Sequence, residues 1–250
     1  MKATPLLTGW TCRHLGDTTP GRPVTLPHDA MLAEPRTALS AGGVNTGWYE
    51  GYDYEYQRTL TVPENELSDT HILEFEGVYH NAEVWLNGQK AAFRPYGYTN
   101  FYVDCAPFLR AGDNELRVIA RNADQPNSRW YSGAGLYRPV QLWTAGKKHI
   151  LLNGVRIRTV SLDPAVVEIR VRTSAPGTVR LMVEGLPAVR QESDGEVVFT
   201  LTIDNVRLWT PETPNLYRCR VQFEDDEAVE TFGVRTVGWG KNGFTLNGER

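Results

Sequence analysis

The sequence has few of the features that mark membrane, secreted or nucleic-acid-binding proteins. No stretch of its 250 residues approaches the ~20 apolar residues of a membrane span, and its first residues lack the apolar run of a secretory signal. Its 26 Lys plus Arg stand against 30 Asp plus Glu, with no basic block longer than Lys147-Lys148. Because this charge is balanced, we expect neither nucleic acid nor membrane as a partner. The lack of a secretory signal and of a membrane span leads us to expect a cytoplasmic location.

Cysteine is also scarce, with only Cys12, Cys105 and Cys219, an odd and scattered set. Neither a CxxC pair nor Cys and His at zinc-ligand spacing occurs. The sequence therefore predicts three reduced thiols in or near the core, with no metal site and no cofactor.

Long apolar runs of period 3.6, which are typical of helices, are missing as well. Apolar and polar residues instead alternate over short segments, such as residues 82–86 and 116–120, and turn residues such as Asn87-Gly88 separate them. About eight or nine such strands precede Leu142, which predicts a jelly-roll sandwich. Further alternating strands, including 166–171 and 178–183 on either side of a Pro176-Gly177 turn, predict an immunoglobulin-like sandwich of roughly 90 residues.

Three motifs in one order carry a family resemblance: GVYHNAEVWLNG at 77–88, AGDNELRVIARN at 111–122 and SRWYSGAGLYRPV at 128–140. Together they resemble the N-terminal sugar-binding domain of family 2 glycoside hydrolases, the β-galactosidase and β-glucuronidase group. The resemblance extends to TGWYEGYDYEYQRTL upstream and to LWTPETPNLYRCRVQF, FGVRTVG and GFTLNGER downstream. It implies a jelly-roll domain over 1–147, an immunoglobulin-like β-sandwich over 148–238, and a link over 239–250 to a (β/α)8 catalytic barrel.

The resemblance also implies a chemistry that this chain lacks. Family 2 enzymes hydrolyse β-glycosides with retention, using two glutamates on strands of the barrel, and a barrel alone needs about 250 residues. We therefore assign no catalytic residue and expect these 250 residues to be inactive alone. For the parent enzyme a β-galactoside is the predicted substrate, with β-glucuronide and β-mannoside as alternatives.

In the family, the loop around SRWYSGAGLYR approaches the sugar at the mouth of the barrel. The resemblance therefore implies sugar contacts from Asn127, Arg129, Trp130 and Tyr131. An aromatic ring can stack on the apolar face of a pyranose, and Asn or Arg can donate to its hydroxyls. The alternative is that Trp130 and Tyr131 are core aromatics, and that Arg129 and Arg138 form ion pairs.

Two other groups resemble catalytic residues, and we interpret both as structural. Adjacent residues of an extended chain, such as His28 and Asp29, point to opposite sides, and no serine nucleophile motif accompanies them. Glu74 and Glu76 lie about 6.6 Å apart along one face of a predicted strand. We expect a polar strand face there, since nothing in the local sequence desolvates either carboxylate.

Three functions remain open on the sequence alone. The first is the non-catalytic region of a family 2 hydrolase, which supports the barrel and borders the sugar site. The second is a stand-alone carbohydrate-binding module. The third is a structural scaffold that braces the barrel and helps to form a homo-oligomer.

Overall fold

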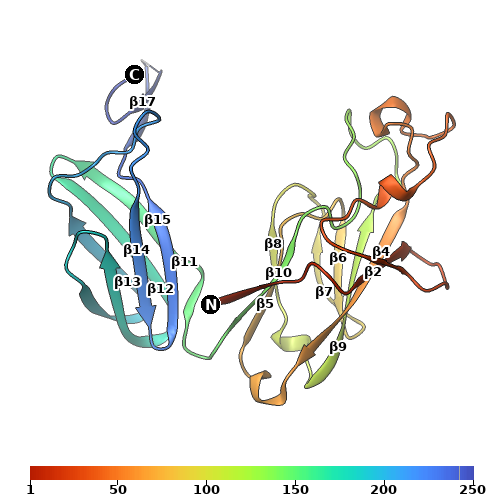
Figure 1. The fold of residues 1–250 in the computed structure, drawn as a ribbon, viewed down its shortest axis with the longest axis horizontal. Helices are drawn as coiled ribbons and strands as arrows, with labels where there is room; N and C mark the ends of the chain where they lie inside the picture. Colours follow the sequence, from red (N-terminus) through yellow and green to blue (C-terminus); the bar gives the residue numbers. More distant parts are fainter. Residues whose placement is uncertain (242) are drawn as a thin grey trace. The chain divides into compact units, whose positions relative to one another are not determined.

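The structure is a computed structural model that describes residues 1–241 and 243–250. The chain divides into two compact units, Lys2–Thr144 and Ala145–Arg250, the second of which includes Met1. Both units consist of antiparallel strands, and the only helices among the described residues are four short 3₁₀ turns (Figure 1). The all-β prediction is confirmed.

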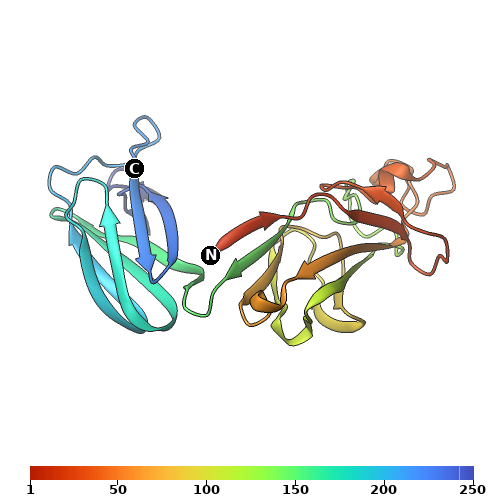
Figure 2. The ribbon, with the colours of Figure 1, turned by 60° about the horizontal axis from the view of Figure 1, so that its bottom comes forward.

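The first unit is a sandwich of two antiparallel sheets. One sheet has the strand order β3-β2-β4-β9-β6-β7 and the other β1-β10-β5-β8. The strands of the six-stranded sheet are β2 (Trp10–His14), β3 (Arg22–Val24), β4 (Asp53–Val62), β6 (Ala82–Leu86), β7 (Gln89–Arg94) and β9 (Gly112–Arg121). Those of the four-stranded sheet are β1 (Lys2–Pro5), β5 (Thr70–Phe75), β8 (Phe101–Asp104) and β10 (Val140–Ala145). In Figure 2, β1 runs beside β10, so that the start of this unit is paired with its end.

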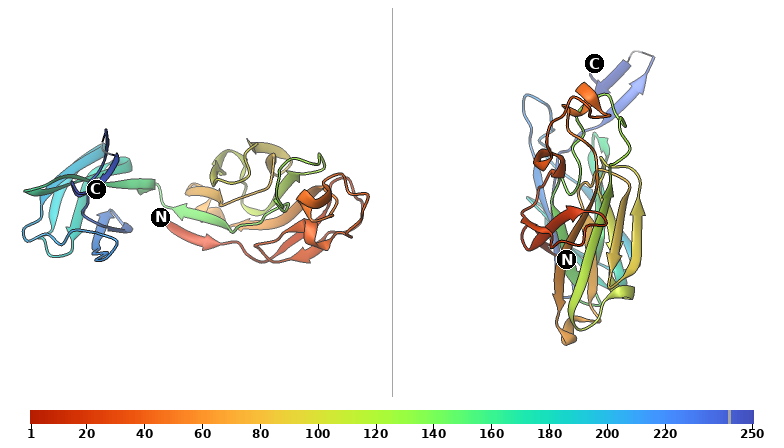
Figure 3. Two further views of the ribbon diagram at one scale, coloured as in Figure 1. Left: turned by 90° about the horizontal axis from the view of Figure 1, so that it is seen from above. Right: turned by 90° about the vertical axis from the view of Figure 1, so that its right-hand side faces the viewer.

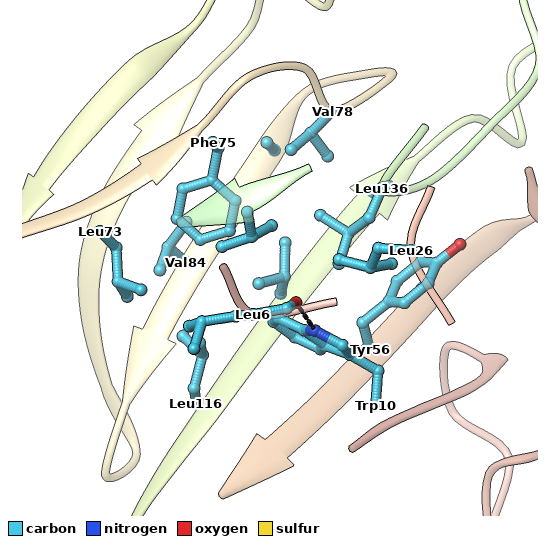
Figure 4. Close-up of a cluster of buried hydrophobic side chains, with 14 of the residues drawn as sticks. Leu6, Trp10, Leu26, Tyr56, Leu73, Phe75, Val78, Val84, Leu116 and Leu136 are labelled. Carbon is cyan, nitrogen blue, oxygen red and sulfur yellow. Dashed lines mark hydrogen bonds between the residues drawn. The ribbon is translucent and has the colours of Figure 1, made fainter. Parts of the chain in front are cut away.

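Apolar and polar residues alternate along the strands, which places the apolar side chains in the core between these sheets. Tyr54, Tyr56, Leu60 and Val62 of β4 are all buried, whereas the residues between Tyr56 and Val62 on the other face are more exposed. Trp10 is 1% exposed and its indole N–H donates to the carbonyl of Leu6 at 2.7 Å (Figure 4). Because buried polar groups must find partners, this bond lets the indole lie in an apolar core.

The predicted Asn-Gly hairpin is confirmed between β6 and β7. Asn87 and Gly88 both have positive φ, 48° and 79°, which a type I′ turn requires. The Asn87 amide also donates to the carbonyl of Phe108 at 2.9 Å and to Asn114 at 2.8 Å. The turn is therefore joined to the buried Asn114 at the start of β9.

The 3₁₀ helices lie in the connections: η1 (Ala30–Ala33), η2 (Gly43–Thr46), η3 (Glu64–Glu66) and η4 (Ala106–Phe108). The connection that carries η1 and η2 and the loop between β9 and β10 lie at the same end of the first unit (Figures 1 and 3). These two connections together hold every residue for which the sequence predicts a sugar contact, along with His28 and Asp29.

The second unit is a sandwich formed by one sheet of five strands, and a separate two-stranded hairpin follows it. Its strands are β11 (Ile150–Leu162), β12 (Ala165–Val183), β13 (Val189–Thr202), β14 (Tyr217–Phe223), β15 (Asp226–Phe232), β16 (Val237–Gly240) and β17 (Gly243–Leu246). The core contains apolar residues of β12, β13 and β14, among them Ile169, Leu181, Phe199 and Phe223.

The Pro176-Gly177 turn predicted in this unit is wrong. β12 continues through it, pairing with β11 in its first part, with β14 in its last part and with β13 on both sides of a register shift between Arg172 and Pro176. A shift of register lets one strand bend and pass from one layer to the other. A proline and a glycine at such a bend give the same sequence signal as a turn.

The cysteines are free and buried, as predicted. Burial raises the pKa of Cys12 to about 11 and those of Cys105 and Cys219 to about 12. Since the thiolate is the reactive form, we expect iodoacetamide at pH 8 to label none of them in the folded chain and all three in urea, as measured by intact mass. Labelling of the folded chain at the rate of a free thiol would contradict this burial.

Among the described residues, no helix has the length and apolar composition needed to cross a membrane.

Candidate functional site

The two connections at the end of the first unit are joined by the carboxylate of Asp29. Its Oδ1 accepts the backbone N–H groups of Met31 at 3.1 Å and Ala134 at 3.0 Å, and its Oδ2 accepts the hydroxyl of Tyr131 at 2.6 Å. The backbone of Ala30 adds a hydrogen bond to the carbonyl of Ala134 at 2.9 Å. Asp29 is therefore the point that positions the SRWYSGAGLYR loop.

Tyr131 is held by its hydroxyl while part of its ring stays exposed. The ring is 39% exposed, and its centroid lies 6.0 Å from that of Tyr49. Burial, together with the hydrogen bond to the Asp29 carboxylate, raises the pKa of Tyr131 above its usual value. The hydroxyl consequently stays protonated and acts as a donor to Asp29.

Trp130 contributes to an aromatic surface, defined here as the side chains of Tyr96, Tyr98 and Trp130. They are 56%, 37% and 59% exposed. The Trp130 indole donates to the hydroxyl of Tyr98 at 3.0 Å, and the rings of Tyr96 and Tyr98 are 5.7 Å apart between centroids. The Tyr79 ring packs against the Tyr98 ring, with 5.3 Å between their centroids. The core alternative is wrong for Trp130, whose indole is exposed but fixed in orientation.

Asn127 and Arg129 take different roles in the same loop. The Asn127 amide donates to Asn122 at 2.8 Å and to the carbonyl of Asp124 at 3.0 Å, and its oxygen accepts from Tyr79 at 3.2 Å. It therefore braces the loop internally. Arg129 is exposed, and within residues 1–241 and 243–250 neither Arg129 nor Arg138 forms an ion pair with an acid.

His28 and Asp29 point to different partners, as the extended backbone predicts. The Nδ1 of His28 shares a hydrogen bond of 2.8 Å with the hydroxyl of Tyr56, and burial lowers the pKa of this histidine. Gly135 packs directly on Tyr56, because a Cβ added there would lie 2.0 Å from the tyrosine hydroxyl. Gly133 packs on Asp29 in the same way, at 2.7 Å from Oδ2. Both glycines have positive φ, so they permit the backbone path of the loop.

Glu74 and Glu76 are structural, as predicted, but Glu74 is more buried than the sequence suggests. It is 8% exposed, and its carboxylate accepts the indole N–H of Trp143 at 2.8 Å and the amide of Asn100 at 3.0 Å. Glu76 accepts from Gln141 at 2.8 Å. The residues that cover Glu74 are distant in sequence, so the local pattern could not reveal them. No cluster of metal-ligating side chains occurs among the residues that the structure describes.

Tyr96, Tyr98 and Tyr79 are the site residues that the sequence analysis missed. The available signal was Tyr96-Gly97-Tyr98, a glycine between two aromatics. A Cβ at Gly97 would lie 2.6 Å from the Tyr79 ring, so glycine lets this segment approach that ring. Exposed tyrosines on a turn of this kind are typical of a binding surface.

Two family models match the chain. The model described as "Glycosyl hydrolase 2 galactose-binding domain-like" matches residues 21–159, and the one described as "Glycosyl hydrolases family 2" matches residues 154–235. The first alone covers more than half of the chain.

Individual relatives agree with this assignment. The chain is 33% identical over 273 residues to the β-galactosidase BoGH2A of Bacteroides ovatus, covering 95% of this chain and 32% of that protein. It is 27% identical over 236 residues to a β-glucuronidase of Paenibacillus borealis, covering 79% of this chain and 39% of that protein. The crystal structure of a β-glycosidase from Bacteroides vulgatus has a TM-score of 0.84 and 25% identity, covering all of this chain and 36% of the other.

The chain spans between about a third and two fifths of the length of these relatives. Its two sandwiches correspond in order to the two matched family models. The chain belongs to glycosyl hydrolase family 2.

Proposed function

We propose that this chain is the non-catalytic region of an enzyme that hydrolyses terminal β-glycosides with retention, where it supports the catalytic barrel and borders the sugar site. The observation that carries the proposal is the exposed aromatic surface, whose indole is oriented by Tyr98. Exposed aromatic rings of this kind can stack on the C–H groups of a pyranose. Asn127 orients the loop, and Arg129 and Tyr131 are the neighbouring polar groups that can reach sugar hydroxyls.

We propose a β-galactoside as the substrate, in keeping with the similarity to a β-galactosidase. A β-glucuronide is the second candidate, favoured by the similarity to a β-glucuronidase. The assay that separates them compares p-nitrophenyl β-galactoside with p-nitrophenyl β-glucuronide, using the longest natural polypeptide that contains these residues. Failure of both substrates and of p-nitrophenyl β-mannoside, with a folded protein, would contradict the hydrolase proposal and leave a stand-alone carbohydrate-binding module.

In that polypeptide we expect Trp130→Ala to lower kcat/KM about tenfold, mainly through KM, because stacking binds ground state and transition state alike. This corresponds to about 1.4 kcal/mol. Phe93→Ala is the matched control, since Phe93 is 54% exposed in the same unit and lies outside the aromatic surface. An unchanged KM in Trp130→Ala would remove the aromatic surface from the sugar site.

Two further parts of the proposal concern the whole protein. A cytoplasmic location is supported by three free, buried cysteines, which suit a reducing compartment. A homo-oligomer is the expectation for an accessory region that also acts as a scaffold. Sedimentation velocity over a hundredfold concentration range tests it, and a constant monomer mass would contradict it.

A further inference from the structure

A cavity of about 320 Å³ lies in the first unit, lined by β2, the connection that follows it, η1 and Tyr54 of β4. No residue of the aromatic surface lines it. Its apolar wall includes Pro20, Pro23 and Val24. The volume lies at the lower end of the range of small-molecule sites, which is enough for a single sugar ring.

Glu34 places a carboxylate at this cavity. Its Oε1 is hydrogen-bonded with the Nε2 of His14 at 2.7 Å and accepts from the hydroxyl of Tyr54 at 3.4 Å. Its Oε2 has no hydrogen-bond partner among the described residues, although the side chain is only 11% exposed. The His14 ring is itself fixed by stacking on Tyr52, with centroids 4.4 Å apart. One oxygen of a rigidly held carboxylate therefore remains available to a hydroxyl donor.

Donors line the same cavity. Arg22 is exposed there and forms no ion pair within the part of the chain that the structure describes. The Nδ1 of His28 shares a hydrogen bond with Tyr56, which leaves Nε2 without a partner among the described residues. Nε2 donates in one tautomer of the imidazole and accepts in the other. Burial lowers the pKa of His28, so its imidazole is uncharged at neutral pH. Arg13 is already paired with Glu55, with Nε at 2.9 Å from the carboxylate.

The charges select the kind of ligand. An anion would meet the carboxylates of Glu34 and Asp17, and a cation would meet the guanidinium of Arg22. A neutral ligand with several hydroxyl groups suffers neither repulsion, because each hydroxyl can both donate to a carboxylate and accept from a guanidinium or an imidazole. Proline and valine side chains meet the C–H groups of such a ligand.

We propose that this cavity is a second carbohydrate site, which binds one ring of a neutral sugar through Glu34, Arg22 and His28. It is separate from the aromatic surface and requires no catalytic barrel, so it exists in the 250-residue chain itself.

The test is an NMR titration of the 250-residue chain with methyl β-galactoside, with galacturonate and galactosamine as the charged probes. We expect millimolar binding of the neutral sugar, with amide shifts in residues 12–34, and at least fivefold weaker binding of both charged probes. No binding of the neutral sugar at 50 mM, or tighter binding of either charged probe, would overturn the proposal.

Two variants locate the binding. Glu34→Gln removes the carboxylate charge and should weaken binding at least fivefold, whereas Glu66→Gln, at an exposed position, should not change it. Ala33→Phe fills the cavity from its exposed rim and should abolish binding, whereas Ala111→Phe should not. The thermal unfolding midpoint of each variant is first compared with that of the unsubstituted chain, so that loss of folding is not counted as loss of binding.

Trp130→Ala separates this proposal from the proposed function. It should leave the shifts of residues 12–34 unchanged, even where it impairs hydrolysis by the longer polypeptide. If Trp130→Ala abolishes the titration and Ala33→Phe does not, the sugar binds the aromatic surface and the cavity site is wrong.

Discussion

Gly135→Ala should destabilise the first unit by about 2–6 kcal/mol, combining backbone strain of about 1–3 kcal/mol with a steric clash of similar cost. The added Cβ would lie 2.0 Å from the hydroxyl and 2.8 Å from the Cζ of Tyr56, which is fully buried. Tyr56 cannot move away freely, because His28 holds its hydroxyl and the core surrounds its ring. The φ of Gly135 is +97°, which an L-residue rarely adopts.

Urea unfolding combined with amide exchange of β4 and β9 measures this effect in the first unit, while the second unit serves as an internal reference. Gly16→Ala separates the two causes, since Gly16 has a φ of +94° and nothing within 4 Å of its added Cβ. It should cost only the backbone strain of about 1–3 kcal/mol. Tyr56→Phe in the Gly135→Ala background should recover part of the loss. Equal costs at both glycines would show that the contact with Tyr56 does not matter.

The sequence predicts the strands of this protein well because, in a strand with one buried face, apolar and polar residues alternate over a few neighbouring positions. The pattern of β4 and the Asn87-Gly88 turn are both visible within ten residues. Pro176-Gly177 misleads for the same reason, since a bend inside a long strand and a turn between two strands use the same residues.

The site is less predictable because its contacts join distant segments. Tyr131 and Asp29 are 102 residues apart, and Trp130 and Tyr98 are 32 apart. An aromatic residue in a Gly-rich loop carries no local mark of burial, so Trp130 could be assigned to the core or to a surface. The cavity at Glu34 is lined by three separate segments of the chain, so no single sequence motif marks it. The family resemblance identified the loop that carries Trp130, but it did not identify the side chains that hold this loop in place.

The second large effect concerns Asp29, whose carboxylate satisfies two backbone N–H groups and one hydroxyl. Asp29→Ala should cost about 2–4 kcal/mol, since it leaves the N–H of Ala134, in a buried segment, without its acceptor. It should also release the loop that carries Trp130, because Tyr131 loses its anchor. Urea unfolding measures the first effect, and amide exchange of residues 128–134 measures the second.

Conservative variants divide that cost among the individual bonds. Asp29→Asn retains an oxygen for the two N–H groups and should cost less than half as much as Asp29→Ala, while Tyr131→Phe removes only the hydroxyl and should cost about 1 kcal/mol. The KM for hydrolysis by the longer polypeptide should then rise as this loop becomes less ordered. Asp29→Ala should therefore raise KM at least as much as Trp130→Ala does. If Asp29→Ala leaves amide exchange in residues 128–134 unchanged, the loop is held by its backbone hydrogen bonds with His28 and Ala30, and the carboxylate serves only to begin η1.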